Sequence, residues 1–400
     1  MHSETKPAVT WKSRLKQELT DGILGFWMKH APDDTHGGFL GEIMPDLTVT
    51  PQADKSLVLN TRILWTFAAA YRLDGAEAYQ QTAKRAYDYL LHYFVDREHG
   101  GMYWMLHADG SVSNDKKQVY GQAFAIYALS EYYRATGHEE ALELAITLFR
   151  MLEEHSYDTV HKGYVEAMSR EWQQTEDFSL SDKDLNEHKS MNTHLHVMEA
   201  YTNLLRVWQS EQLRRTLAEL IEVTLDHIVH PDRSRFLLFF DEAWASKSDH
   251  ISYGHDIEGS WLLVEAAEVL GDATLLERVK RTAIAMAEHA LACGVDPDGG
   301  MVNEADAAGV IDARKDWWPQ AEAMVGFYNA YQLTGQDRFR DASYRSWQFI
   351  EASLIDHEHG EWFWNTDRDG RPNRCQPKVS AWKCPYHNGR ACMEMLERLG

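Results

Sequence analysis

The stretch Asp96-Arg-Glu-His-Gly100-Gly101-Met-Tyr103 is one copy of a pattern in which an aspartate precedes glycine and a large apolar side chain. Related copies recur at intervals of 60 to 73 residues, centred on Gly38, Gly101, Gly163, Phe236, Gly300 and Gly360. The fourth copy, which follows Asp232, has lost its glycine. Self-similarity at a nearly constant spacing is typical of repeated supersecondary units, so the chain is predicted to contain six of them.

Each repeat also contains two stretches with helical periodicity, and the first of these usually ends in glycine. The glycines are Gly75, Gly137, Gly271, Gly335 and Gly400, whereas the third copy, around 200–204, lacks one. Glycine just past an apolar periodic run is the preferred C-terminal cap. The second helical stretches cover 76–95, 140–157, 211–229, 273–293 and 337–355. Each unit is therefore predicted to be helix, short loop, helix and a brief glycine-rich hairpin.

The two ends of the chain complete one another in this scheme. Residues 11–31 supply a helix that pairs with the incomplete last unit, 389–400. A ring closed in this way leaves no terminal repeat exposed, whereas an open superhelix needs polar caps. We therefore expect an all-α fold, an (α/α)6 barrel with short glycine-rich β-hairpins between helix pairs, as a single catalytic domain over residues 1–400. The open superhelix is the alternative.

Composition limits the possible partners. The formal net charge is -22, which argues against nucleic acid and anionic membranes, since both select basic surfaces. The four cysteines include no CxxC pair, so neither a disulfide scaffold nor a zinc knuckle is expected. The chain shows no apolar leader and no run of 18 uncharged apolar residues, so we expect a soluble, cytoplasmic protein that is a monomer or weak homo-oligomer. Its 14 tryptophans favour a flat, neutral ligand.

Polar and aromatic residues gather where the glycine-terminated helices begin. A purely structural ring would place capping residues such as Ser or Asp at these points. Taken singly, each has a structural alternative: Arg62 could pair with an acid, Tyr120 could bury its ring, and His194 could cap a helix or sit in the core. Together they indicate a site at one mouth of the ring, with indoles to cover sugar C–H surfaces and polar groups to bind hydroxyls. The candidates are Arg62, Tyr120, Asn192, His194, His196, His255, Glu258, Trp318, Trp382 and His387.

Two further features carry less information. His194 and His196 are two residues apart, a spacing that does not direct both rings at one metal ion on a helix, and no third ligand is apparent, so no metal is expected. The acidic segment 176–189, which includes Asp182 and Asp184, is long enough to fold over the mouth as a lid. The alternative is that this segment is a solvated surface loop.

Four segments resemble those of the N-acylglucosamine 2-epimerase superfamily, and in particular its cellobiose 2-epimerase group. They are Asn60-Thr-Arg-Ile-Leu-Trp65, Met191-Asn-Thr-His-Leu-His196, Ser252-Tyr-Gly-His-Asp-Ile-Glu258 and Trp382-Lys-Cys-Pro-Tyr-His-Asn-Gly-Arg390. The resemblance covers nearly the whole chain and implies an (α/α)6 barrel without metal or nucleotide, and reversible epimerisation at C2 of a reducing-end glucose or mannose unit.

By position in these motifs, the resemblance implies a role for each matching residue. His255 and His387 would be the acid/base pair, and Arg62, Tyr120, Asn192, His196 and Glu258 would surround the reacting carbon. Trp318 and Trp382 would hold the sugar rings, and Asp184 would reach the non-reducing unit. Relatives that act on free mannose as 2-epimerases, or that isomerise mannose to fructose, share the superfamily motif and remain alternatives.

These residue types suit the implied chemistry. Histidine titrates near neutrality, so two imidazoles on opposite faces of an enediolate can remove and return the C2 proton. Arg62 would stabilise the developing negative charge. Glu258, one helical turn from His255, is expected to orient that imidazole or else to bind a hydroxyl.

Two other classes remain in view. An inverting glycoside hydrolase needs two carboxylates that flank the bond, and Asp184, Asp256, Glu258 and Asp316 are the available ones. A non-catalytic sugar-binding protein would need the tryptophans but not the two histidines.

Overall fold

The computed structural model describes residues 10–181, 184–231 and 234–400. Asp182 of the predicted lid, Asp232 of the fourth sequence repeat and the first nine residues lie outside these ranges. Within them, no helix combines the length and the apolar character that a bilayer crossing requires.

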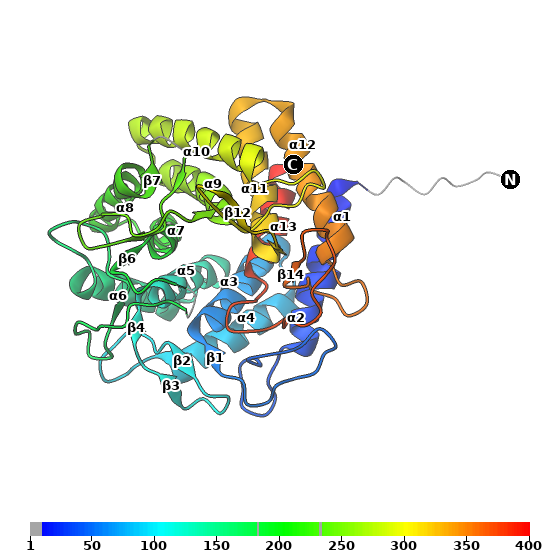
Figure 1. Ribbon diagram of the computed structural model, residues 1–400. Helices are drawn as coiled ribbons and strands as arrows, with labels where there is room; N and C mark the ends of the chain where they lie inside the picture. The colour runs from blue at the N-terminus through cyan, green and yellow to red at the C-terminus, as the bar shows by residue number, and fades with distance from the viewer. Residues whose placement is uncertain (1–9, 182–183, 232–233) are drawn as a thin grey trace.

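An inner ring of helices forms the centre of the fold (Figure 1). Each inner helix contacts the next one along the chain, and α13 contacts α3, which closes the ring. The predicted (α/α)6 toroid is therefore confirmed, and the open superhelix is wrong. The inner helices are α3 (Leu57–Asp74), α5 (Val119–Thr136), α7 (Met191–Val207), α9 (Tyr253–Leu270), α11 (Trp317–Thr334) and α13 (Tyr386–Arg398).

The outer layer surrounds this ring, and its first member closes the circle. Helix α1 (Trp11–Gln17) and the π-helical turn η1 (Glu18–Leu24) both contact α13, as the sequence predicted, and α2 (Gly25–His30) follows them. Three of the outer helices end in a π-helical turn where a continuous helix was predicted. The outer elements are α4 (Glu77–Tyr89) with η2 (Leu90–Phe94), α6 (Glu139–His155), α8 (Glu211–Val223) with η3 (Thr224–Ile228), α10 (Ala273–Cys293), and α12 (Asp337–Phe349) with η4 (Ile350–Leu354).

Glycine ends four of the inner helices, as predicted. Gly75, Gly137, Gly271 and Gly335 each adopt a left-handed backbone with φ between 68° and 77°, and each donates its N–H to the last helical turn. Residues with a β-carbon avoid this conformation, which is why glycine recurs there. Helix α7, whose sequence copy lacks glycine, ends instead at an extended Trp208.

Short strands join neighbouring repeats at the end of the ring where the inner helices begin. A strand that precedes an inner helix pairs antiparallel with a strand of the following repeat. The strands are β1 (Lys55–Ser56), β2 (Met105–Leu106), β3 (Val112–Asn114), β4 (Lys117–Gln118), β5 (Ala167–Met168), β6 (Lys189–Ser190), β7 (Val229–His230), β8 (Arg235–Phe236), β9 (Phe239–Phe240), β10 (Ile251–Ser252), β11 (Glu304–Asp306), β12 (Gly309–Asp312), β13 (Lys315–Asp316) and β14 (Asn365–Thr366).

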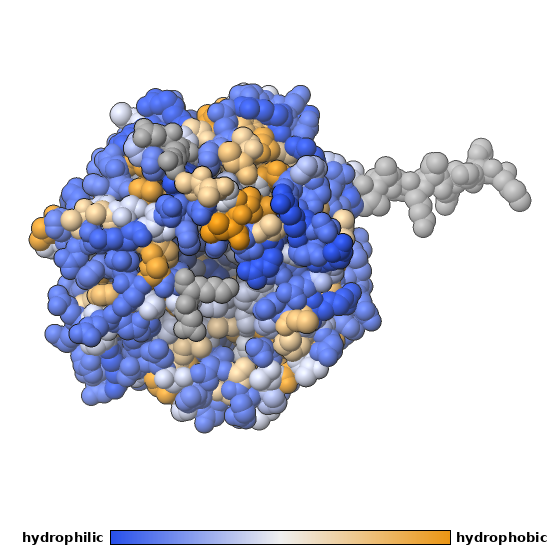
Figure 2. All heavy atoms as spheres, viewed as in Figure 1, coloured by the Kyte–Doolittle hydropathy of each residue, from blue (hydrophilic) through white to orange (hydrophobic). Residues whose placement is uncertain are grey.

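This end of the ring is mostly hydrophilic in the view of Figure 2, with a hydrophobic patch near the centre of the face over β12. Val310 and Ile311 of that strand are exposed. The hydrophilic face agrees with the strongly acidic composition of the chain.

A buried lysine explains the repeated Asp–Gly pattern. In the first unit, Lys55 Nζ lies 2.7 Å from Asp33 Oδ2 and also donates to the Gly37 carbonyl, while Asp33 Oδ1 accepts two N–H groups of the turn. One aspartate thus shapes the glycine turn and fastens it to the strand before the inner helix. The fourth unit has Ile251 at the lysine position. The ion pairs are Lys55–Asp33, Lys117–Asp96, Lys189–Asp158, Lys315–Asp296 and Lys378–Asp356, and Lys315 also pairs with Asp298.

The fourth residue of the inner helices makes a second recurring clamp. In four consecutive inner helices this side chain accepts the backbone N–H of an apolar or aromatic residue in the hairpin of the repeat, 2.7 to 2.9 Å away. The clamps fix the start of each helix against its hairpin. The four pairs are Gln122–Met102, His194–Tyr164, Asp256–Phe236 and Gln320–Met301.

At the other end of the ring, polar side chains of neighbouring inner helices bind one another near a cavity of about 100 Å³. These pairs connect successive inner helices near their C-terminal ends, so arginine side chains hydrogen-bonded to glutamate or amide oxygens occupy this end of the ring. They are Arg72–Glu131, Arg134–Asn203, Arg206–Glu265 and Arg398–Gln332.

Lys55→Met tests the lysine–aspartate pairs. Removing one member of a buried ion pair leaves an uncompensated charge, so the free energy of unfolding is expected to fall by about 3–5 kcal/mol. Denaturant unfolding measures this change. The double variant Lys55→Met/Asp33→Asn, in which no charge remains, should lose less; equal losses would contradict the ion-pair explanation.

Candidate active site

One register of the inner helices supplies a ring of side chains that converge inside the toroid. The side chain is the sixth residue of its helix in five cases and the fifth in α13, and all of them are buried. We call this set the sixth-position ring. Its members are Arg62, Phe124, His196, Glu258, Glu322 and Arg390.

Arg390 is the hub of this ring. Its Nη2 donates to Glu258 Oε1 and to Glu322 Oε1, each at 2.7 Å. Its Nη1 donates to Glu199 and to the hydroxyl of Tyr386. One guanidinium therefore binds three buried acidic side chains from three different helices.

The carboxylates around Arg390 differ in their affinity for protons. Burial favours the neutral form of Glu199, but the charge of Arg390 and hydrogen bonds from His196 and Tyr386 outweigh it and lower the pKa to about 2. Burial and then the charge of Glu322 raise the pKa of Glu258 to about 8. Glu258 and Glu322 lie too close to hold two full charges easily, whereas Glu199 is a fixed anion.

Three histidines at the site each engage Nδ1 in a hydrogen bond with a polar partner. His387 Nδ1 lies 2.7 Å from Glu322 Oε1, and His196 Nδ1 lies 2.8 Å from Glu199 Oε2. His255 Nδ1 lies 2.7 Å from the hydroxyl of Ser252. A partner at Nδ1 fixes the orientation of the imidazole and directs Nε2 away from the helix, where it can act as an acid or base.

Burial makes these imidazoles neutral when the site is empty. Burial, then the charge of His196, lowers the pKa of His255 to about 3. Burial and the charges of Arg62 and Arg390 hold the pKa of His387 well below its usual value. Two neutral imidazoles near neutral pH suit proton abstraction.

His255 and His387 share one neighbour, Trp318. The indole lies 4.6 Å from the His255 ring and 5.7 Å from the His387 ring, centroid to centroid. Trp318 belongs to α11, which contacts both α9 and α13, the helices that carry the two histidines. The fold therefore brings these distant parts of the sequence to one wall of the site.

Arg62 lies among aromatic rings. Its guanidinium carbon is 4.3 Å from the Phe124 centroid and 4.9 Å from the Tyr386 centroid, and Nη2 donates to the Tyr120 hydroxyl at 2.7 Å. Arg62 Nε has no hydrogen-bond partner among the described residues. Cation–π contacts thus hold a charged group in place without neutralising it.

Trp382 and Asn192 lie near the mouth. The Trp382 ring is half-buried and contacts Tyr120 and Trp104 at centroid distances of 6.0 and 6.2 Å. Asn192 is also half-buried, and its Oδ1 has no partner in the described part of the chain. Asp184 lies on the loop before β6, where its carboxylate accepts from the Ser181 hydroxyl at 2.5 Å. Their proposed contacts with sugar stay predictions.

The structure argues against a substrate-binding role for His194. Its Nδ1 donates to the Ser190 carbonyl and its Nε2 accepts the Tyr164 N–H, so neither nitrogen remains for a sugar. His194 occupies the clamp position that Gln122 and Gln320 occupy in other repeats. The sequence pattern suggested a ligand because histidine is an unusual residue at a helix start.

The expected pairing of Glu258 with His255 is also corrected. Ser252 holds His255, whereas Glu258 bonds Arg390 and lies 3.8 Å from Nδ1 of His387. Glu258 is the sixth residue of α9 and His255 the third, and Glu258 turns toward the centre of the ring. Spacing along one helix did not reveal partners on other helices.

Glu258, Glu322 and His387 form a cluster whose ligand atoms all lie within 4.8 Å of one another. Arg390 donates to both carboxylates, so its charge already compensates the two acids that a metal ion would need. The expectation of a metal-free reaction stays a prediction.

Four residues of the site were not predicted from the sequence: Glu199, Ser252, Glu322 and Arg390. Glu322 has the same helical register as Arg62, His196 and Glu258, and counting from each helix start would have found it. Glu199 lies one further turn along α7 from His196.

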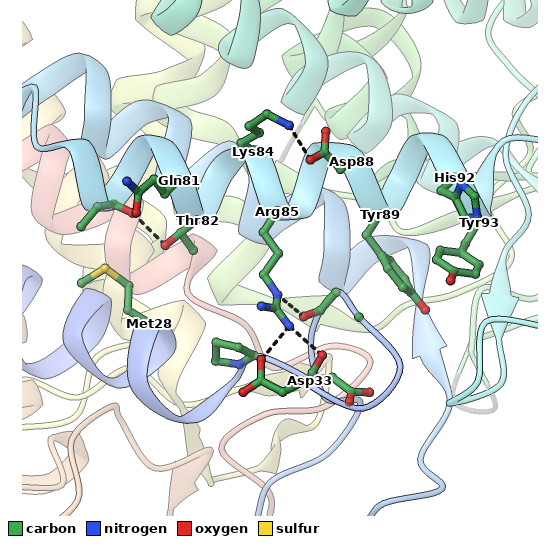
Figure 3. A pocket seen from close by; sticks show the side chains of 15 residues that line it. Met28, Asp33, Gln81, Thr82, Lys84, Arg85, Asp88, Tyr89, His92 and Tyr93 are labelled. Carbon is green, nitrogen blue, oxygen red and sulfur yellow. Dashed lines mark hydrogen bonds and ion pairs between the residues drawn. The ribbon is translucent and has the colours of Figure 1, made fainter.

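A large surface groove lies elsewhere, between α4 and the loop after α2 (Figure 3). Its volume is about 950 Å³, and Arg85 fastens the loop there through the carbonyls of Asp33 and Gly38. None of the described residues that line it is a predicted site residue. The candidate site residues lie in the ring interior and not in this groove.

Imidazoles with one nitrogen left to act, beside partly exposed indoles in a helical toroid, are typical of an enzyme that moves protons on a sugar. The profile of the N-acylglucosamine 2-epimerase (GlcNAc 2-epimerase) family matches residues 38–391. The chain belongs to this family, which confirms the resemblance seen in the sequence.

Individual relatives agree with the family assignment. The chain is 48% identical over 390 residues to the cellobiose 2-epimerase of Bacteroides fragilis, a match that covers 96% of this chain and 98% of the relative. The structure of the cellobiose 2-epimerase from Bacillus thermoamylovorans B4167 is 41% identical, with a TM-score of 0.92 over 97% of this chain and 99% of that one. A D-mannose isomerase structure, 23% identical with a TM-score of 0.85 over 98% and 99% of the two chains, shares the fold.

His194→Gln tests the clamp assignment. Gln320 makes the equivalent bonds in α11, to the Met301 N–H and the Asp316 carbonyl, so glutamine should retain the fold and near-normal kcat. Burial lowers the pKa of His194 to about 4, so the unfolded chain takes up a proton first as the pH falls below 6.5. The wild type should therefore lose stability between pH 7 and 5 more steeply than the variant, as thermal melts would show. A fall in kcat of more than about tenfold would contradict the clamp.

Proposed function

We propose that this protein catalyses reversible C2 epimerisation of the reducing-end aldose of a β-1,4-linked disaccharide, converting cellobiose to glucosyl-mannose. The observation that carries this proposal is the pair His255 and His387, both in contact with Trp318 and each held through Nδ1. The full-length similarity to the cellobiose 2-epimerase of Bacteroides fragilis supports the substrate class.

The reaction begins with opening of the sugar ring, which exposes the C1 carbonyl and acidifies the C2 proton. One histidine Nε2 takes that proton, leaving an enediolate across C1 and C2. The other histidine, protonated from solvent before this step, gives its proton to the opposite face of C2. The configuration inverts, the first histidine ends as the imidazolium and the second as the neutral imidazole, so atoms and charge balance. Histidine suits both tasks because a modest change in surroundings moves its pKa across the working range.

Arg62 stabilises the enediolate in this scheme. Phe124 and Tyr386 hold its charge through cation–π contacts, and no carboxylate of the described residues forms an ion pair with the guanidinium. Tyr120 accepts one of its N–H groups. A fixed cation at the point where negative charge develops lowers the barrier without reorganisation.

Glu199 and Glu322 support the histidines. Each accepts a hydrogen bond from one imidazole and from Arg390. The Glu322 carboxylate favours the imidazolium of His387 once it takes a proton. Trp318 and Trp382 offer indole faces to sugar rings near the mouth.

Three alternatives differ in how well the site supports them. Free mannose 2-epimerisation or aldose–ketose isomerisation would use the same histidines and differ in substrate contacts or in the carbon that is reprotonated. Hydrolysis is poorly supported, because Asp256 is a buried clamp to the Phe236 N–H and Asp316 accepts from Asn365. Glu258 and Glu322 meet on one arginine instead of flanking a bond. Cytoplasmic location and a monomeric or weakly homo-oligomeric state stay predictions.

Incubation of the protein with cellobiose and, separately, mannose in D₂O tests the proposed function. Deuterium should appear at C2 of the epimeric product, as NMR would show, because the abstracted proton exchanges with solvent. His255→Ala and His387→Ala should each abolish the exchange while retaining the fold. Release of glucose from cellobiose would show hydrolysis, and fructose from mannose would show isomerisation. Unchanged sugar would exclude all three reactions.

Arg62→Gln tests the role of the charge. Loss of an enediolate-stabilising donor is expected to lower kcat by about 10²–10³. Arg72→Gln provides the matched control, since Arg72 lies on the same helix but pairs with Glu131 at the opposite end of the ring. Steady-state kinetics that show equal losses in both variants would exclude a specific role for Arg62.

A further inference from the structure

Three inner helices are preceded by serine, and one of these serines is used differently from the others. The Ser56 hydroxyl accepts the Leu59 N–H at 2.9 Å, and the Ser190 hydroxyl accepts the Thr193 N–H at 3.1 Å. Both are ordinary N-terminal caps. The Ser252 hydroxyl makes no such bond at the start of α9.

The Ser252 hydroxyl instead lies 2.7 Å from Nδ1 of His255. His255 stands where Leu59 and Thr193 stand in the other two helices, three residues after the serine. Helix α9 thus gives up the cap that its two counterparts keep, and the serine contacts the side chain of that third residue in place of its backbone N–H.

We propose that Ser252 is a positioning residue for the epimerisation, which holds His255 by Nδ1 so that Nε2 faces the sugar. The inference rests on the proposed function. It separates the two histidines by the chemistry of their partners.

The partners differ in charge. His387 and His196 face the carboxylates of Glu322 and Glu199, which stabilise an imidazolium. A serine hydroxyl is neutral and can donate or accept, so it orients His255 in either protonation state and stabilises its charged form less.

Other groups also affect the proton affinity of His255. His196 of α7 disfavours a positive charge on His255, and Glu322 of α11 favours it. Trp318, also from α11, covers the ring without a charge. Because none of these groups changes when Ser252 is substituted, variants at this position isolate its contribution.

Ser252→Ala, Ser252→Thr and Ser252→Asp test the inference, with pH profiles of kcat and KM for cellobiose. The alanine variant should lose about tenfold in kcat with little change in KM, because the imidazole loses its orienting partner. The threonine variant should restore kcat, because it restores the hydroxyl. The aspartate variant should move the acidic limb of the kcat/KM profile to higher pH, because a carboxylate favours the imidazolium.

Ser190→Ala is the matched control. It removes a true helix cap, so it should lower the melting temperature and leave the pH profile unchanged, whereas Ser252→Ala should change kcat with a smaller effect on melting. Titration of His255 by NMR in the wild type and in Ser252→Asp gives a readout independent of turnover; the aspartate should raise its pKa.

The outcomes separate this inference from the proposed function. Wild-type protein that places no deuterium at C2 would overturn the function itself. Active wild type together with normal kcat in Ser252→Ala, or an unmoved His255 titration and pH profile in Ser252→Asp, would overturn the positioning role alone.

Discussion

The buried guanidinium of Arg390 is the constraint on which the site depends. Three carboxylates, Glu199, Glu258 and Glu322, come from α7, α9 and α11 and meet on this one cation from α13. Removing a partner from such a group leaves a buried charge without compensation, at a cost of about 3–5 kcal/mol. The same carboxylates hold His196 and His387, so closing the ring and orienting the imidazoles are one event.

The repeated architecture separates support from chemistry by position along each helix. The fourth residue clamps the helix to its hairpin, whether it is glutamine, histidine or aspartate. The sixth residue faces the interior, where the fold constrains its location but not its identity. Six copies of one scaffold can thus place an arginine, a histidine or a glutamate at equivalent points around a common centre.

Much of the fold could be predicted from the sequence, because glycine has a local reason to recur. Gly75 and its counterparts end helices in a conformation that other residues avoid, and the aspartates shape their turns through neighbouring N–H groups. The lysine–aspartate pairs could not be predicted, because Lys55 follows Asp33 by 22 residues and the ion pair exists only after folding. The π-helical ends, such as η2, likewise have no evident sequence signal.

Prediction of the site was less complete for a related reason. Arg62, His255 and His387 stand in recognisable motifs, and the fold brings them to one interior. Glu322 lies within Gln-Ala-Glu-Ala-Met, where one acid in an apolar helix attracts no attention. Glu258 was assigned to His255 by spacing, and His194 to sugar by residue type, because partners on other helices cannot be counted along the chain.

Ring closure also has a consequence for folding during translation. Trp27 bonds Glu361 across 334 residues, and His387 and Arg390 follow later still. Until α13 has left the ribosome, the nascent chain has an open arc of helices with acids that lack their cation, so catalytic competence must arrive abruptly once this last helix of the ring can pack.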